Sequence, residues 1–422
     1  MTADIARSIA TRRSTVLSGL LAAALGNALE WFDLISYGFL APVIGKLFFP
    51  SADPHSSLLI ALGTFGVAYL SRPLGGIVLG LYADRAGRKA ALLAGMLLMM
   101  AGTLLLTLTP TYAAIGLAGP ILIVCARLLQ GFAAGGEFGS ATAFLVEQST
   151  DRRAFFASWQ MASQGLSISL GAGVAAALAA LLSPETLMSW GWRIPFALGL
   201  LIGPVAFYIR ARVDETPDFR RAAAGVPLQS SFPQLSRRQL LVALGVVALA
   251  TVAAYMLIYA PSYAATQLKL SLRSGGWAVM ASGAVVFLLT PLFGLAADAF
   301  GPVRVGMIAA AALTLLPVPL FLWLADAPSA FRLALVDILI AIPTAAYYGP
   351  LGALMSSLFP TRGRSTGLSA SYNLAVIVFG AFAPLTMEWL INRTHWLAVP
   401  GIYLAIAALI SFGVLAVIKQ EE

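Results

Sequence analysis

The side chains best suited to chemistry are a few ionisable and polar groups inside long apolar segments. Glu30, Asp33 and Tyr37 are spaced three and four residues apart, and Arg127 stands three residues before Gln130. On a helix, the members of each set share one face. An ionisable group at the centre of a bilayer costs about 3 kcal/mol on insertion scales, so such groups tend to face a partner or a water-filled cavity. We therefore expect these residues to line an internal polar site.

Arg127 is the predicted anchor for a substrate. It is the one clear cation near the midplane, because it lies about twelve residues from the end of its predicted helix. A guanidinium stays charged and can hold a carboxylate through two parallel hydrogen bonds. The alternative is an ion pair with Asp33 or Glu30 that only holds two helices together. The two roles are compatible, because a pair that breaks when substrate binds would act as a coupling device.

Asp33 is our first candidate for carrying a proton, and Glu30 is the second. A carboxyl group in a cavity of low dielectric constant can change its protonation when substrate arrives at a nearby arginine. Glu30 has an alternative structural role, since its carboxylate could bond to Asn27 one turn earlier.

Amide and phenol side chains are the remaining candidates for substrate contacts: Tyr37, Gln130, Gln160, Gln164, Tyr259, Tyr372 and Asn373. Amide groups can donate hydrogen bonds to the carboxylates or hydroxyls of a substrate. The alternative for Gln160 and Gln164, which are one turn apart, is hydrogen bonding between helices, which contributes about 1 kcal/mol in membranes. Tyr263 lies near a helix end, where a tyrosine is commonly a membrane-interface anchor.

The composition requires a membrane around most of this chain. Of its 422 residues, 59% are hydrophobic and 10% are charged, against roughly 25% charged residues in a soluble domain. Apolar runs of about 20 residues, enough to cross a hydrocarbon core as a helix, recur along the whole sequence. The runs lack the alternation of barrel strands, and in lipid every backbone polar group must be satisfied internally. The sequence therefore predicts an all-α polytopic membrane protein.

The apolar runs between turn and charge signals predict twelve transmembrane helices. They fall near residues 17–41, 57–82, 90–109, 115–147, 154–182, 190–211, 240–266, 275–298, 303–325, 329–358, 365–391 and 396–418. Most arginines and lysines fall in one set of connecting loops, so the positive-inside rule places both termini in the cytoplasm. The expected location is a bacterial-type inner (plasma) membrane.

The net charge of +8 does not indicate nucleic acid, because the basic residues are scattered between apolar spans. Membrane topology and anionic lipid headgroups account for this charge. Cys125 lies in an apolar run, and His55 and His395 lie in connecting segments, so neither a disulfide nor a metal cluster can be assembled. We therefore expect no metal and no cofactor.

An internal repeat divides the chain into two halves. GLYADRAGRK follows the second predicted helix, and GLAADAFGPVR follows the eighth, which is second in its own half. A polar stretch rich in Arg, Pro and Ser separates the sixth helix from the seventh. We predict two pseudo-symmetric six-helix bundles, at 1–211 and 240–422, joined by a cytoplasmic linker at 212–239.

Several further charges are expected to act in the conformational cycle. Three charges of the first repeat are predicted to form a cytoplasmic network that locks helices and is released during cycling: Asp84, Arg85 and Arg88. Three other charges could join such networks: Arg72, Glu137 and Glu147. Asp337, in the tenth helix, has no assigned role. Small residues repeat every four positions at Gly131, Gly135 and Gly139, and again at Gly165, Ser169 and Gly173, which lets helix backbones approach closely.

The repeat segment GLYADRAGRK resembles the signature loop of the major facilitator superfamily, a Gly-x-x-x-Asp-Arg/Lys-x-Gly-Arg pattern between helices two and three. More specific strings surround it: GNALEWFDLISYGFLA, FFPSADP, SRPLGG, ARLLQGFAAGGEFG, WGWRIPF, DETPDF and LFPTRGRSTGLSASYNLA. Together they resemble the metabolite:proton symporter family over nearly all of the chain. That family includes citrate and tricarballylate carriers, 2-oxoglutarate and shikimate permeases, and the proline/betaine carrier.

The resemblance implies a secondary transporter that works by alternating access with the proton as coupling ion. ASWQMASQGLSISLGAG is similar to the citrate carriers, whereas SYNLA and GNALEWFD are closer to the proline/betaine pattern. We expect uptake of citrate or a related di- or tricarboxylate, although a single central cation argues against a tricarboxylate. The alternatives are a zwitterion such as proline or betaine, and a monocarboxylate such as shikimate. No nucleophile–base pair or nucleotide loop indicates an enzyme, and we expect a monomer.

Overall fold

The computed structural model describes residues 24, 27, 28, 30–86, 88–146, 151–212, 236–359 and 364–421, which are almost entirely helical. The N-terminal half begins with a helix described continuously over Glu30–Phe39. It continues with α2 (Ala41–Phe48), α3 (Pro54–Leu70), α4 (Arg72–Ala86), α5 (Arg88–Leu108), α6 (Tyr112–Ile115), α7 (Ala118–Ala134), α8 (Glu137–Val146), α9 (Arg153–Leu181), α10 (Pro184–Ser189), η1 (Gly191–Arg193) and α11 (Ile194–Arg212).

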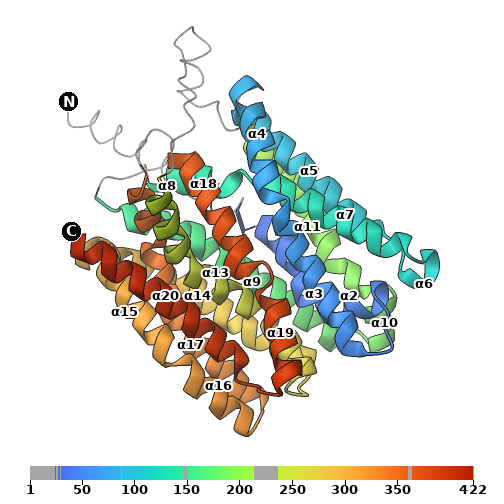
Figure 1. The fold of residues 1–422 in the computed structure, drawn as a ribbon. Helices are drawn as coiled ribbons and strands as arrows, with labels where there is room; N and C mark the ends of the chain where they lie inside the picture. The colour runs from blue at the N-terminus through green and yellow to red at the C-terminus, as the bar shows by residue number, and fades with distance from the viewer. Residues whose placement is uncertain are drawn as a thin grey trace, which may run out of the picture.

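The C-terminal half consists of α13 (Arg237–Thr266), α14 (Leu272–Phe300), α15 (Pro302–Leu315), α16 (Pro317–Asp326), α17 (Ala330–Ser357), α18 (Arg364–Ala375), the π-helical turn η2 (Val376–Gly380), α19 (Ala383–Thr394) and α20 (Val399–Glu421). The helices of each half gather into a bundle, blue to green for the first and yellow to red for the second (Figure 1). We call the end that carries α6 and α10 the outer end, and the opposite end the inner end, after the predicted orientation.

The predicted helices all fall on helices of the structure. Among the described residues, nine helices are long and apolar enough to cross a membrane, and a bent pair in the first span makes a tenth. The two other predicted spans, near 90–109 and 190–211, coincide with α5 and α11. The polar linker predicted at 212–239 lies largely outside the described residues, between the end of α11 and the start of α13.

The first helix differs from its predicted course. It was expected to end near residue 41, but it breaks at Leu40 and bends by 67° into α2. Pro42 lies in the first turn of α2, where its missing N–H group is tolerated, whereas it would break a helix interior. The residues that follow the predicted helix end, Lys46 among them, therefore form a short apolar helix at the outer end.

The second predicted helix breaks between α3 and α4 at Ser71. Pro73, two residues later, has no N–H group to continue the helical ladder, which explains the break. The Ser71 hydroxyl instead donates to the carbonyl oxygen of Leu128 in α7 at 2.7 Å. The break therefore fixes Arg72, the first residue of α4, against the neighbouring helix.

Glycines bring helix backbones into direct contact, as predicted. A Cβ at Gly131 would overlap the carbonyl oxygen of Ala68, and a Cβ at Gly135 would overlap that of Arg72, so α7 touches α3 and α4. The second small-residue stripe joins the two halves, because a Cβ at Gly165 in α9 would lie 3.1 Å from the carbonyl oxygen of Gly283 in α14. Each contact leaves no room for a side chain.

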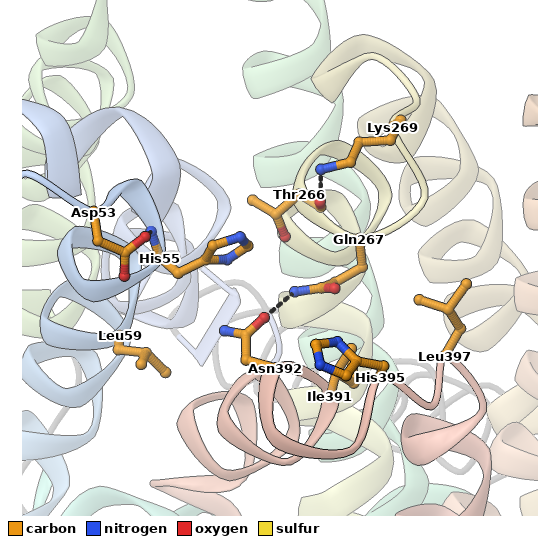
Figure 2. A pocket seen from close by; sticks show the side chains of 10 residues that line it. All are labelled: Asp53, His55, Leu59, Thr266, Gln267, Lys269, Ile391, Asn392, His395 and Leu397. Atoms are coloured by element: carbon orange, nitrogen blue, oxygen red, sulfur yellow. Dashed lines mark hydrogen bonds between the residues drawn. The ribbon is translucent and has the colours of Figure 1, made fainter.

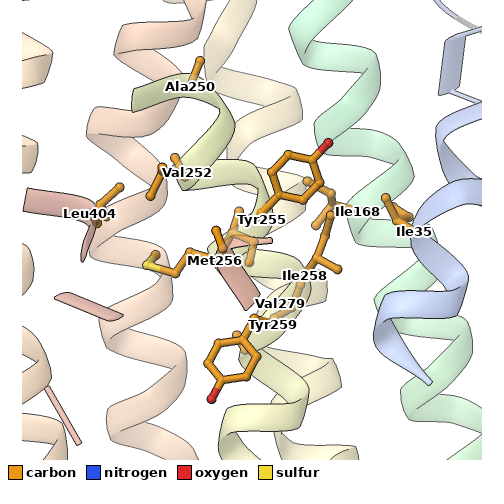
Figure 3. Close-up of a cluster of buried hydrophobic side chains, with 14 of the residues drawn as sticks. Ile35, Ile168, Ala250, Val252, Tyr255, Met256, Ile258, Tyr259, Val279 and Leu404 are labelled. Atoms are coloured by element: carbon orange, nitrogen blue, oxygen red, sulfur yellow. The ribbon is translucent and has the colours of Figure 1, made fainter. Parts of the chain in front are cut away.

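The core of the molecule lies around α13, in which every residue from 245 to 264 is buried. A helix that is apolar all round belongs in an interior. Figure 3 shows Tyr255 and Tyr259 leaving this helix in different directions, with Tyr255 toward Ile168 of α9. The two tyrosines therefore belong to different polar regions.

Candidate functional site

Arg127 is fully buried on α7, where its guanidinium lies 4.8 Å from the ring centre of Tyr37 and 5.3 Å from that of Phe65. Its Nη1 donates to the carbonyl oxygen of Leu34 (3.1 Å) and to Oε1 of Gln130 (2.9 Å). Its Nε is buried without a hydrogen-bond partner. Since a guanidinium has five N–H donors, Arg127 retains the capacity to bind another group.

Arg72 is a second buried arginine, so the prediction that Arg127 is the one central cation was wrong. Arg72 is 3% exposed, and its guanidinium lies 5.0 Å from the ring centre of Tyr69 and 5.7 Å from that of Trp31. Its Nε and Nη1 are buried without hydrogen-bond partners. The sequence did hold a signal, an arginine before Pro73 well inside the apolar run at 57–82.

Two tyrosines, one from each half, lie between the arginines. Tyr69 and Tyr255 pack edge to face with ring centres 5.3 Å apart, and each interacts electrostatically with both guanidinium groups. Their hydroxyl groups lie close to each other, and that of Tyr37 lies close to Thr64, but none of the three makes a well-formed hydrogen bond. We call Tyr37, Tyr69, Arg72, Arg127 and Tyr255 the arginine cluster.

Unpartnered buried polar atoms are uncommon, because each costs about 1–3 kcal/mol. In the arginine cluster every member has at least one such atom. The missing partners are acceptors for the guanidinium groups, and acceptors or donors for the phenols. A bound polar ligand with several oxygen atoms can supply them.

Asp33 is 6% exposed and faces α5 and α11. Its Oδ2 accepts a hydrogen bond from Thr103 Oγ1 at 2.8 Å, and its Oδ1 presses against Gly199 without a hydrogen-bond partner. The described contacts include no direct ion pair between Asp33 and Arg127. Thr103 was not identified from the sequence, and no sequence signal distinguishes it from the other threonines of α5.

Glu30 lies one turn before Asp33, is partly buried, and is close enough for the two charges to interact. Asn27, its expected partner, bonds to α9 instead: Gln160 Nε2 donates to Asn27 Oδ1 at 2.9 Å, and Asn27 Nδ2 donates to Ser163 Oγ at 2.6 Å. Gln160 thus forms a hydrogen bond between helices, which is the alternative to substrate contact that we considered for it from the sequence.

Gln164, Tyr372 and Asn373 lie together where the two halves meet toward the inner end. Gln164 is next to Tyr372, and its amide atoms are buried without well-formed hydrogen bonds. Tyr372 stacks on Phe138, with ring centres 3.5 Å apart, and it interacts electrostatically with Arg72. Asn373 Nδ2 donates across the halves to the Gly135 carbonyl oxygen at 2.7 Å, while its Oδ1 has no partner.

The second repeat motif closes the inner end through Asp298. Its two carboxylate oxygens accept from the backbone N–H groups of Ala154 (2.8 Å) and Phe155 (2.9 Å) at the N-terminus of α9, a position that favours an anion. Gly301 follows with φ of 93°, which favours glycine. The side chains of the matching first repeat, Asp84, Arg85 and Arg88, and that of Glu147, lie outside the described residues.

Glu388, in α19, organises the outer end and was missed in the sequence. It is fully buried, and its carboxylate accepts hydrogen bonds from Tyr259 Oη and from Gln267 Nε2 (2.7 Å). It also lies 3.4 Å from Asn392 Nδ2 and 3.4 Å from His55 Nδ1, which belongs to the other half. We call these five residues the Glu388 hub. An acid inside the apolar run at 365–391 was the available signal.

A pocket of about 480 Å³ lies above the Glu388 hub, between α3 of one half and α13 and α19 of the other. Figure 2 shows its polar lining, with Gln267 bonded to Asn392 and Lys269 bonded to the Thr266 carbonyl oxygen. His55, at its edge, has a side chain that is 41% exposed. Tyr259, predicted to contact substrate, therefore belongs to the outer end and not to the arginine cluster.

Asp53 caps α3 at the edge of this pocket. The hydroxyl of Ser56 and the backbone N–H groups of His55 and Ser56 donate to its carboxylate, and these bonds hold the pKa of Asp53 below its ordinary value. The cap orients the first turn of α3, which carries His55 toward Glu388. Local capping therefore supports a contact between the two halves.

Asp337 and Tyr263 form a buried pair beside the Glu388 hub, because the ring centres of Tyr263 and Tyr259 are 6.0 Å apart. Asp337 is 1% exposed, its Oδ2 has no hydrogen-bond partner, and its charge interacts with Tyr263. Tyr263 is 2% exposed and donates to the Leu397 carbonyl oxygen at 2.7 Å, so its predicted role as a membrane-interface anchor was wrong. Within the described part of the chain, no cluster of three His, Cys, Asp or Glu side chains could hold a metal ion.

Comparisons with known proteins agree with this architecture. Residues 19–225 match the family model described as "Sugar (and other) transporter". The fold resembles that of a proton:xylose symporter of the major facilitator superfamily, with a TM-score of 0.78 and 16% identity, covering 97% of this chain and 96% of the other. At that identity the likeness concerns the fold alone.

Two curated relatives are much more similar in sequence. The citrate-proton symporter of Klebsiella pneumoniae is 35% identical over 408 residues, covering 96% of this chain and 92% of the relative. The glycine betaine/proline/ectoine/pipecolic acid transporter of Dickeya dadantii is 35% identical over 411 residues, covering 93% of this chain and 81% of the relative. Motifs, fold and relatives agree, and the chain belongs to the metabolite:proton symporter family of the major facilitator superfamily.

Proposed function

We propose that this transporter takes up a small organic acid together with a proton, and that citrate or a related di- or tricarboxylate is its substrate. The observation that carries the proposal is the pair of buried arginines, Arg72 and Arg127, whose guanidinium groups retain unpartnered N–H donors. Two fixed positive charges suit a ligand with two or more carboxylates, since each guanidinium can hold one carboxylate bidentately. The argument against a tricarboxylate assumed a single central cation, so a second buried arginine removes its basis.

In the proposed cycle, the two bundles rock around the arginine cluster and expose it to each side in turn. Tyr37, Gln164, Tyr372 and Asn373 would complete the binding site around the arginines, and Asp33 would carry the proton. The protein would work as a monomer in the inner membrane, with both termini in the cytoplasm, without a cofactor and without chemical turnover of its substrate.

A zwitterionic osmolyte such as proline or betaine is the second candidate. The aromatic rings near the arginines favour it, because ring faces bind quaternary ammonium groups. However, the rings of Trp31 and Tyr69 lie against Arg72, and those of Tyr37 and Phe65 lie against Arg127. A ligand ammonium group would therefore meet two cations.

A thermal-shift screen of purified protein separates these substrates, because a ligand that binds only the folded state raises its melting temperature. Citrate and tricarballylate should stabilise the protein, whereas shikimate, proline and glycine betaine should have little effect. Uptake of citrate into proteoliposomes should need an inward proton gradient and no sodium. Stabilisation by betaine alone, or uptake that follows sodium after a protonophore collapses the proton gradient, would contradict the proposal.

A further inference from the structure

Arg127 and Asp33 are joined by a continuous chain of hydrogen bonds through two other buried side chains. Arg127 Nη1 donates to Gln130 Oε1 at 2.9 Å, and Gln130 Nε2 donates to Thr103 Oγ1 at 2.9 Å. Thr103 Oγ1 in turn donates to Asp33 Oδ2 at 2.8 Å. The chain runs from α7 through α5 to the first helix, and its four members are at most 6% exposed.

The direction of this chain is set by Arg127. A guanidinium can only donate, so Gln130 must present its oxygen to Arg127 and its NH₂ group to Thr103. The Thr103 hydroxyl has one hydrogen, and because it accepts from Gln130 it gives that hydrogen to Asp33. Among the described contacts, Thr103 is the one hydrogen-bond donor to the Asp33 carboxyl group. The orientation of the donor to the Asp33 carboxyl group thus depends on Arg127, three hydrogen bonds away.

Two glycines make room for the chain. A Cβ at Gly102 would lie 2.8 Å from Gln130 Cγ, which brings Gln130 against α5 beside Thr103. A Cβ at Gly199 would overlap Asp33 Oδ1, so Asp33 fits against α11 only because that position lacks a side chain. The arrangement leaves Asp33 and Gln130 little freedom to move away from Thr103.

We propose that Thr103 and Gln130 couple substrate to proton by passing the state of Arg127 to Asp33. This inference rests on the proposed function, in which the substrate carboxylate binds Arg127 and the proton binds Asp33. A carboxylate that binds the unpartnered Nε of Arg127 and draws the guanidinium group toward itself weakens the Nη1 contact that orients Gln130, so the Thr103 hydroxyl is free to turn. Asp33 then loses a donor that stabilises its ionised form, so substrate binding favours proton binding. By linkage the proton equally favours substrate, which is the sign that symport requires.

Thr103 is therefore a positioning residue, and its hydroxyl is the group to test. Thr103→Val keeps the branched shape without the hydroxyl, and Thr103→Ser keeps the hydroxyl. Thr107→Val is the matched control, because Thr107 lies one turn away on α5, is also buried, and donates to the Thr103 carbonyl oxygen at 2.6 Å.

We expect Thr103→Val still to exchange citrate across the membrane, but its citrate affinity should no longer follow the protonation of Asp33. The concentration ratio driven by a proton gradient should fall at least about tenfold, which is the factor that corresponds to one hydrogen bond to a charged group. Thr103→Ser and Thr107→Val should accumulate citrate like the parent. Parent-like accumulation by Thr103→Val, or an equal defect in Thr103→Ser, would overturn the relay.

An infrared measurement tests the relay without any substrate. The C=O stretching band of the protonated Asp33 carboxyl group is identified by its loss in Asp33→Asn. This band should shift in Thr103→Val and stay in place in Thr103→Ser and Thr107→Val, and an unshifted band in Thr103→Val would contradict the relay. If the parent neither binds nor takes up citrate while the band shifts as expected, the proposed substrate fails and the Thr103–Asp33 contact of the relay stands.

Discussion

The arginine cluster and the Glu388 hub are both buried, polar, and shared between the two halves, yet they differ in how fully their polar atoms are satisfied. Every member of the arginine cluster has a buried atom without a hydrogen-bond partner. Glu388 instead receives bonds from Tyr259 and Gln267, with Asn392 and His55 close by. A site built for a ligand leaves groups unsatisfied until the ligand arrives, whereas a structural contact is complete in itself. The difference supports the proposed binding site in the first region and favours a structural contact between the two halves in the second.

Replacing either arginine should have the largest effect on ligand binding. Arg72→Gln and Arg127→Gln should each weaken citrate binding by about tenfold to hundredfold, since a hydrogen bond between charged groups contributes about 1.5–3 kcal/mol. Arg127→Lys should also bind more weakly, because lysine keeps the charge but loses the planar fork. Equilibrium binding of labelled citrate to purified protein measures this effect.

The control for these variants is Arg332→Gln, which removes an arginine that contacts Trp323 at the outer end. Its citrate affinity should equal that of the parent. If Arg72→Gln binds citrate like the parent in well-folded protein, the second cation is structural and the two regions do not differ in the way described.

Glu388→Ala should lower stability and leave citrate affinity near the parent value. The substitution strands the buried hydroxyl of Tyr259, at a cost of about 1–3 kcal/mol, and removes one of the two acceptors of the Gln267 amide. Glu388→Gln, which keeps one acceptor, should cost less. Thermal unfolding in detergent and citrate binding, measured on the same preparations, check both parts. A loss of affinity as large as that of Arg127→Gln would show that Glu388 belongs to the binding site.

Much of the architecture could be predicted, because the apolar runs and turn signals are local features of the sequence. The glycine stripes were likewise recognisable, since small residues at every fourth position permit close backbone contact. The break at Leu40 was not predicted, because the apolar run continues through it and only Pro42 marks the bend.

The candidate site was only partly predictable, because its members meet through tertiary packing. Arg127 and Asp33 were recognised as rare charges inside apolar runs. Arg72 was assigned to a possible charge network, because the sequence around it does not show which aromatic rings enclose it in the fold. Glu388 has its partners in α3, α13 and α19, and no spacing in the sequence brings these together.

His55→Gln should change the population of the state with an open outer pocket, and this effect should be smaller than that of Glu388→Ala. The His55–Glu388 contact is long, at 3.4 Å, and His55 is partly exposed, so it contributes at most about 1 kcal/mol, or roughly a fivefold change in population. The outer pocket should open more often. Labelling of a cysteine placed at Leu59, with exposed Cys125 replaced by serine, measures the opening. Labelling at the parent rate would exclude His55 from the contact that keeps the outer pocket closed.

Asp53→Asn should have the smallest effect, visible as a change in pH dependence. Because hydrogen bonds hold the pKa of Asp53 below its ordinary value of 3.8, its stabilising cap is complete at neutral pH and is lost as the pH falls below that value. The parent should therefore lose part of its thermal stability on strong acidification, and Asp53→Asn should lose less. Identical acid sensitivity in the two proteins would show that the cap does not support the outer end.

The glycine contacts between α4 and α7 also have a consequence for selecting a ligand by its length, under the proposed function. Arg72 lies on one of these helices and Arg127 on the other, and a Cβ at Gly75 would overlap the carbonyl oxygen of Phe132. Backbone contact, not adjustable side-chain packing, therefore sets the separation of the two helices that carry the arginines. Under the proposed function, that separation determines which distance between two carboxylates in a ligand fits the site. Discrimination between diacids of different chain length would then originate in glycines that never touch the ligand.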